Sequence, residues 1–90
     1  MYEIILSKIA LQDIETLVKS GNRPVIRKVY HLLEELKVNP FKGTGKIERL
    51  KHRQGCLARR ISGEHRLVYT VNRSTVTVNV LKVLTHYGDK

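Results

Sequence analysis

The chain has little of several residue types: no tryptophan, one phenylalanine, one cysteine and two prolines among 90 residues. The single cysteine, Cys56, cannot form a disulfide within the chain and cannot build a zinc cluster alone. No apolar run is longer than a few residues, which excludes a membrane-spanning helix. The start of the chain has neither the basic region nor the cleavage site of a signal peptide. We therefore expect one small cytoplasmic domain over residues 1–90.

Acidic residues are also scarce, with eight Asp and Glu against 17 Lys and Arg and a net charge of +9. Residues 1–40 carry six basic and five acidic side chains, whereas residues 41–90 carry eleven basic and three acidic ones. Because nearly all of the excess charge lies in the second half, it favours a polyanionic partner such as nucleic acid, the ribosome or an acidic protein. A basic protein without a specific partner is the weaker interpretation.

Hydrophobic periodicity predicts two consecutive amphipathic helices in the first half of the chain. Ser7 is a suitable N-cap for the first helix, and Gly21 can end it in the left-handed conformation. The second helix begins at Asn22 and stops at Asn39-Pro40. The apolar faces consist of Ala10, Ile14, Leu17 and Val18 in the first helix, and Val25, Val29, Leu32, Leu33 and Leu36 in the second.

Two-residue alternation predicts a strand at residues 2–6 and a meander of strands after the helices. The later strands are expected at residues 47–51, 57–61, 66–71 and 75–84. The alternation in the last strand breaks near Leu81, which indicates a bulge or a strand buried on both faces. The predicted fold is α+β: an N-terminal strand and helical hairpin packed on one face of a twisted, mainly antiparallel sheet, with the other face open.

Two motifs that would suggest cofactor chemistry fail on inspection. The segment Gly43-Thr44-Gly45-Lys46 lacks the spacing of a phosphate-binding P-loop and precedes a predicted strand rather than a helix. The four histidines and Cys56 do not combine into a set of metal ligands. We expect neither a metal nor a cofactor.

The basic second half contains side chains suited to cutting RNA without a metal. Such a reaction needs a base for the 2′-hydroxyl, an acid for the leaving 5′-oxygen and a cation for the phosphorane. Glu48 is one of only three acids in this half, and Arg66, His86 and Tyr87 are candidates for cation, acid and support. A histidine has a reference pKa near ~6.5 and can exchange a proton at neutral pH.

Adjacent arginines complicate the prediction of a phosphate-binding surface. Arg59 and Arg60 follow one another on a predicted strand, so their side chains point to opposite faces of the sheet. At most one of the two should therefore face a ligand on the open side. The other is expected near an edge or paired with an acid.

Three segments together resemble the Txe/YoeB branch of the RelE-superfamily toxins. They are residues 39–52 (NPFKGTGKIERLKH), residues 59–69 (RRISGEHRLVY) and the pair His86-Tyr87. The order of the N-terminal strand and the helical hairpin fits the same family, so that the resemblance covers essentially the whole chain. Any one of these motifs would be weak evidence, but the combination is specific.

The resemblance implies a toxin of a bacterial type II toxin–antitoxin system with the RelE-like microbial RNase fold. Members of the family are mRNA interferases that cleave mRNA at the ribosomal A site without a metal. By motif, Glu48 matches the general base, Arg66 the arginine that stabilises the phosphorane, His86 the general acid and Tyr87 the tyrosine that shapes the site. We further expect contacts with RNA phosphates from Lys46, Lys51, His52, Arg59 and Arg60.

The resemblance also implies partners. The mRNA would be held on the ribosome with contacts to 16S rRNA, and a YefM/Axe-like antitoxin would cover the basic face with its C-terminal segment. Operator DNA would be reached only through the antitoxin, and no membrane is involved. The sequence does not decide between a monomer and a homodimer.

Departures from the family pattern keep an alternative open. Cys56-Leu57 replaces a frequent aromatic pair, Leu84-Thr85 replaces Arg-Tyr, and Gly88-Asp89-Lys90 extends the tail. A catalytically impaired member that binds RNA, ribosome or antitoxin through the same basic face would fit these changes. A DNA-binding regulator that uses the helical hairpin is less favoured, because residues 1–40 carry a net charge of only +1.

Overall fold

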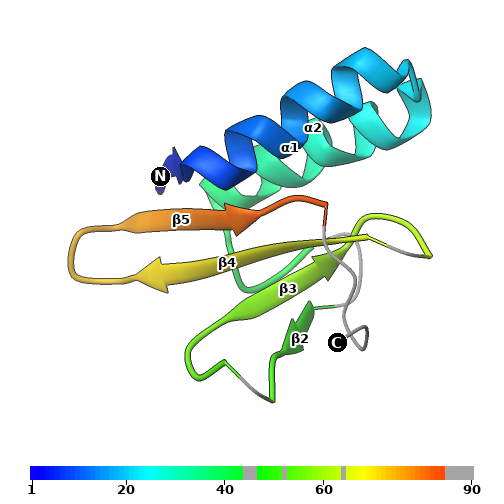
Figure 1. Cartoon of the computed structure of the whole chain (residues 1–90). Coiled ribbons are helices and arrows are strands. Elements are labelled where there is room, and N and C mark those ends of the chain that lie inside the picture. The colour runs from blue at the N-terminus through cyan, green and yellow to red at the C-terminus, as the bar shows by residue number, and fades with distance from the viewer. Residues whose placement is uncertain (44–46, 52, 64, 85–90) are drawn as a thin grey trace.

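The computed structural model describes residues 1–43, 47–51, 53–63 and 65–84. Within them, two helices and five strands form two layers (Figure 1). In chain order the elements are β1 (Glu3–Leu6), α1 (Lys8–Ser20), α2 (Arg23–Val38), β2 (Ile47–Arg49), β3 (Leu57–Arg60), β4 (Arg66–Asn72) and β5 (Thr77–Lys82). This arrangement confirms the predicted α+β fold.

The helices begin and end where the sequence predicts. The Ser7 side chain accepts a hydrogen bond from the backbone N–H of Ala10, and that of Asn22 accepts one from Val25. Gly21 ends α1 in the left-handed conformation, with φ of 74°. These caps satisfy backbone groups that have no partner inside a helix. In the described part of the chain, neither helix has the length and apolar character needed to cross a membrane.

The sheet has the strand order β1-β5-β4-β3-β2, in which β1 runs parallel to β5 and all other neighbours are antiparallel. Figure 1 shows the two helices side by side over one face of this sheet, near β5 and far from β2. The helices contact mainly β1 and β5. The face that carries the helices is called the helix side below, and the opposite face is called the open side.

The hydrophobic core lies between the helices and the helix side of the sheet. Most residues of the two predicted helical faces contribute to it, but Val18 is 53% exposed, contrary to expectation. At 3.6 residues per turn, Val18 lies about 100° around the helix from the buried Leu17. The apolar stripe of α1 is therefore narrower than the sequence suggests.

A β-bulge in β5 confirms the irregularity expected near Leu81. Val80 is in register with Tyr69 on the helix side, but the register shifts between Val68 and Tyr69, and Lys82 is in register with Val68. The Ser7 hydroxyl donates a 2.7 Å hydrogen bond to the carbonyl of Leu81, the extra residue. Because one residue is added, the alternation reverses and Lys82 falls on the open side.

The last strand is shorter at its start than the predicted range of 75–84. Thr75 and Val76 belong to the turn before β5, and Val76 has a positive φ of 52°. A β-branched residue in that conformation is unusual and interrupts the extended backbone. Val76 is consequently exposed, although the alternation with Val78 and Val80 predicts it on their face.

Candidate active site

The open side of β2, β3 and β4 gathers the candidate catalytic residues. Glu48 is in register with Ala58, and Arg60 with Arg66. Side chains alternate along a strand, so these four residues share the face opposite the core residue Tyr69. The long polar side chains of Glu48, Arg60 and Arg66 thus share one surface around the small Ala58.

Glu48 and Arg66 meet directly on this surface. Arg66 Nε donates to Glu48 Oε1 at 3.1 Å, and the two side chains are 15% and 31% exposed respectively. The fold joins two residues that lie 18 positions apart in the sequence. A carboxylate can accept a proton, and a partly exposed guanidinium can donate hydrogen bonds to a phosphate.

Two further cations enlarge the positive surface on the open side. Arg60 is exposed and directly opposite Arg66 across the β3–β4 pair. Like charges in such positions repel, and the nearby Glu48 carboxylate offsets part of that repulsion. Lys82, together with Val68, Ala58 and Glu48, forms a row across four neighbouring strands.

Sequence reasoning did not include Lys82 among the candidate residues. Simple alternation from Val78 and Val80 would place it on the helix side, in the core. The bulge at Leu81 moves it to the open side. The break in alternation near Leu81 was the only signal that could have indicated this placement.

Arg59 is buried in the fold, so the expectation that it contacts RNA phosphates was wrong. Its side chain is fully buried on the helix side, where Nη1 donates to Glu35 Oε1 at 2.8 Å. Nη2 donates to the carbonyl oxygens of Asn39 at 3.2 Å and Lys42 at 2.6 Å. No part of the side chain is left exposed for a phosphate. The opposite orientation of Arg59 and Arg60 agrees with the reasoning from alternation.

Arg59 is part of a buried anchor for the segment between α2 and β2. The Tyr69 hydroxyl donates a 2.7 Å hydrogen bond to the carbonyl of Pro40. Burial raises the pKa of Tyr69 above its usual value of 10.0, and the neighbouring Arg59 opposes that rise. Gly43 has φ of 136°, and a Cβ there would collide with the Glu35 carboxylate and with Arg59. The anchor therefore requires glycine at this position.

Asp13 was also absent from the predicted site, and it holds the end of β5. Its Oδ2 accepts hydrogen bonds from the backbone N–H groups of Val83, at 3.0 Å, and Leu84, at 3.1 Å. A carboxylate that receives two backbone donors is a strong local restraint. It fixes the last described residues of the chain against α1. No feature of the sequence around Asp13 indicates this contact.

The remaining predicted site residues are placed only in part. Lys46, His52, His86 and Tyr87 lie outside the described residues. Lys51 is exposed and lines a pocket beside β2 and β3. Thus the structure brings Glu48, Arg66 and Arg60 together on one face and separates Arg59 from them.

The architecture is similar to that of solved toxins from bacterial toxin–antitoxin systems. A YoeB/ParE toxin from Agrobacterium tumefaciens superposes with a TM-score of 0.84 and 31% identity, covering 94% of this chain and 99% of that one. The structure of a YoeB–YefM complex from Staphylococcus aureus gives a TM-score of 0.78 and 32% identity, over 97% of this chain and 99% of that one. The fold is therefore that of the RelE and YoeB toxins.

Sequence comparison defines the family more closely. The family model described as the YoeB-like toxin of bacterial type II toxin–antitoxin systems matches residues 6–87. Toxin YoeB of Escherichia coli K12 is 38% identical over 58 residues, which is 63% of this chain and 69% of that protein. Toxin RelK of Mycobacterium tuberculosis is 39% identical over 69 residues, or 76% and 79% of the two chains. The chain belongs to the YoeB-like toxin family, as its motifs suggest.

Proposed function

We propose that the chain is a ribosome-dependent endoribonuclease that cleaves mRNA and thereby stops translation. The Glu48–Arg66 pair on the open side carries the proposal, because it supplies a proton acceptor beside a phosphate-binding cation. Membership in a family of type II toxins supports the same conclusion. The cytoplasm, where ribosomes translate mRNA, is the proposed place of action.

The reaction is an acid–base cleavage that uses the 2′-hydroxyl of the RNA as the nucleophile. Glu48 accepts the hydroxyl proton, and the 2′-oxygen attacks the neighbouring phosphorus. Arg66 binds Glu48 through Nε. The two terminal nitrogens of Arg66 can therefore donate hydrogen bonds to the phosphorane oxygens. His86, assigned from its sequence motif, donates a proton to the departing 5′-oxygen. The products are a 2′,3′-cyclic phosphate and a 5′-hydroxyl.

The positive charge around this pair suits a polyanionic substrate. Arg60 and Lys82 share the open side with Arg66 and can contact phosphates on either side of the scissile bond. Tyr87 is assigned to shaping the site by its motif alone. Lys51, Lys46 and His52 remain proposed RNA contacts on the same basis.

We further propose that a small antitoxin covers the open side and blocks cleavage. Structures of a YoeB–YefM complex and of a YoeB dimer are known for Staphylococcus aureus, and each contains a chain that resembles this one over nearly its full length. The surface to be covered is the one that holds Glu48 and Arg66. Operator DNA would be contacted through the antitoxin.

The test is a cell-free translation reaction with a defined mRNA in which 5′ ends are mapped by primer extension. Wild type should create new ends inside ribosome-occupied codons, and Glu48→Ala should not. Glu15→Ala is the matched control, because this carboxylate is exposed on α1. Absence of new ends with wild type, while ribosome binding is retained, would favour the non-catalytic binding module instead.

A further inference from the structure

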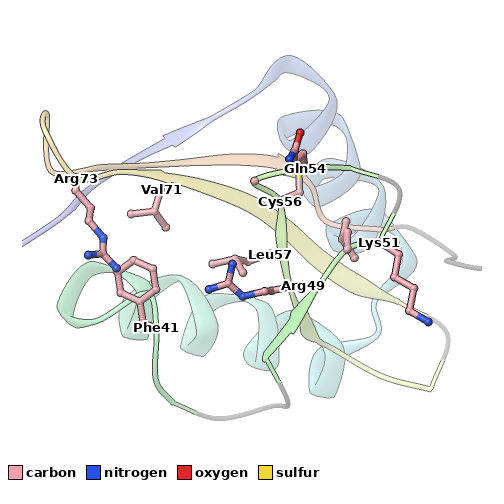
Figure 2. A pocket seen from close by; sticks show the side chains of 10 residues that line it. Phe41, Arg49, Lys51, Gln54, Cys56, Leu57, Val71 and Arg73 are labelled. Carbon is pink, nitrogen blue, oxygen red and sulfur yellow. The ribbon is translucent and has the colours of Figure 1, made fainter.

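A pocket of about 410 Å³ lies beside β2, the outermost strand of the described sheet, on the helix side and away from Glu48. Arg49 and Leu57 are in register there and project to the helix side, where Leu57 and Val71 also pack against the core. We call this the edge pocket. Its lining consists of Phe41, Arg49, Leu50, Lys51, Gln54, Gly55, Cys56, Leu57, Val71 and Arg73 (Figure 2).

The lining of the edge pocket is cationic, aromatic and apolar. Arg49, Lys51 and Arg73 are its charged residues, and no acidic side chain is among the ten. The Arg73 guanidinium lies over the Phe41 ring, 4.6 Å from its centroid. Figure 2 shows Arg49 turned towards Leu57, whereas the ammonium group of Lys51 points outwards from the rim.

This composition matches the chemistry of single-stranded RNA. Unpaired bases stack on aromatic rings and on guanidinium planes, while cations contact the phosphates. The Phe41–Arg73 pair provides stacking surfaces, since Phe41 is 38% exposed. Leu57 and Val71 provide an apolar floor, and the volume lies within the range of ligand sites.

Strand β2 connects the edge pocket to the candidate active site. Glu48 and Arg49 are neighbours on β2 and therefore project to opposite faces of the sheet. Because β2 is the outermost strand of the described sheet, no further strand separates the two faces at this point. An RNA chain that passes around this edge can contact both residues.

We propose that the edge pocket binds one nucleotide of an RNA strand, next to the strand segment held at Glu48. The base stacks on the Phe41–Arg73 pair, and Arg49 contacts the adjoining phosphate. This second site extends the proposed nuclease function and rests on it, because it assumes that the polyanionic partner is RNA. The edge pocket increases the affinity for RNA from the face of the sheet opposite the one that carries Glu48.

The experiment measures binding of a fluorescein-labelled 2′-O-methyl RNA dodecamer, which lacks the free hydroxyl needed for cleavage, over a series of salt concentrations. Arg49→Gln should weaken binding and reduce the slope of log Kd against log salt concentration by roughly 0.7, the value for one phosphate contact on a single strand. Phe41→Ala should weaken binding roughly 5- to 150-fold with little change in slope. Phe41→Leu keeps an apolar side chain and should lose the same affinity, because stacking requires the ring.

Arg27→Gln is the control for charge, since Arg27 is exposed on α2, and it should leave the salt slope nearly unchanged. Melting curves of every variant establish that the domain remains folded. Wild-type affinity and slope in both folded Arg49 and Phe41 variants would overturn the proposal, as would failure of wild type to bind the RNA. The proposal would also be overturned if Arg49→Gln weakened binding of a peptide of alternating Glu and Leu but left RNA affinity unchanged.

The binding assay is independent of catalysis and so separates the two proposals. Glu48→Ala should retain the contribution of Phe41 and Arg49 to RNA affinity. If translation reactions show no cleavage but the edge-pocket variants still lose affinity, the nuclease proposal fails and the RNA site stands. If wild type cleaves mRNA normally but the edge-pocket variants bind RNA as wild type does, the edge-pocket proposal fails and the nuclease proposal stands.

Discussion

Two arginine–glutamate pairs occupy opposite faces of the same sheet, and they differ in exposure. Arg59 and Glu35 meet on the helix side, where the arginine side chain is 0% exposed. Arg66 and Glu48 meet on the open side, where both side chains are partly exposed. The two pairs have the same chemical groups and similar separations, yet only in the second pair does the arginine have exposed surface.

Burial and hydrogen bonding account for this difference in role. The Arg59 guanidinium is held by Glu35 and by two backbone carbonyls, and this fixes the loop that follows α2. Without Arg59, these two carbonyls would lose a donor, and Glu35, which also contacts His31 at 2.9 Å, would lose its buried partner. The Arg66 guanidinium retains donors near solvent, so a phosphate can bind there without disrupting the core. Exposure of the arginine, rather than residue type, separates the structural pair from the pair proposed to act in catalysis.

The largest expected difference between the two pairs is in their contribution to stability. Arg59→Ala should lower the free energy of unfolding by about 3–5 kcal/mol, because Glu35 and two carbonyls lose a buried partner. Arg66→Ala should lower it by no more than about 1 kcal/mol, since its pair is partly exposed. Urea unfolding of both variants measures the contrast. Equal losses would show that burial does not distinguish the pairs.

The next largest effect concerns cleavage. Arg66→Ala should reduce cleavage of ribosome-bound mRNA by roughly 10²-fold, because the phosphorane loses its cationic donor. Its circular dichroism spectrum should remain that of the wild type. Quantitative primer extension at a fixed time measures the loss. A folded Arg66→Ala protein with the wild-type rate would contradict the assigned role.

A smaller loss of stability is expected when the buried anchor loses the hydroxyl of Tyr69. Tyr69→Phe should lower stability by about 1–3 kcal/mol, because the carbonyl of Pro40 loses its buried donor. Since burial raises the pKa of Tyr69 in the folded state, the folded protein binds its proton more tightly than the unfolded chain does. The stabilisation by neutral Tyr69 is complete below the unfolded pKa of about 10 and is lost as the pH rises through the folded value.

Urea unfolding at pH 8 and at pH 11 checks this sign. The wild type should lose more stability between these values than Tyr69→Phe does, since phenylalanine cannot ionise. Tyr30→Phe is the control, because Tyr30 is about half exposed on α2. The same loss in Tyr69→Phe as in wild type would mean that other groups control the alkaline limit.

The smallest expected effect is on RNA binding by Lys82, which the β-bulge places on the open side. Lys82→Gln should reduce the salt slope of RNA binding by roughly 0.7 and change stability little, if Lys82 contacts one phosphate on the open side. Arg27→Gln again serves as the control for loss of charge. A Lys82→Gln variant with an unaltered slope would remove Lys82 from the RNA-binding surface while leaving its position in the fold intact.

Local patterns in the sequence predicted much of the fold correctly. The caps at Ser7 and Asn22, the end of α1 at Gly21 and the irregularity near Leu81 depend on neighbouring residues, and each is confirmed. Val76 and Val18 were placed wrongly because a turn conformation and the width of a helical stripe depend on what packs against them. The sequence motifs indicated Glu48 and Arg66 as candidate site residues. No local pattern predicts that the two side chains form a pair.

The sequence by itself determined the class of fold, the family and the identity of the two residues at the centre of the candidate site, because helical and strand periods and short motifs are encoded locally. Only the tertiary structure decided which of two adjacent arginines is buried, since alternation gives opposite faces without saying which face carries the helices. It also decided that Lys82 lies on the open side and that Asp13 holds the end of β5. These placements depend on register and on contacts between distant segments, which no local pattern contains.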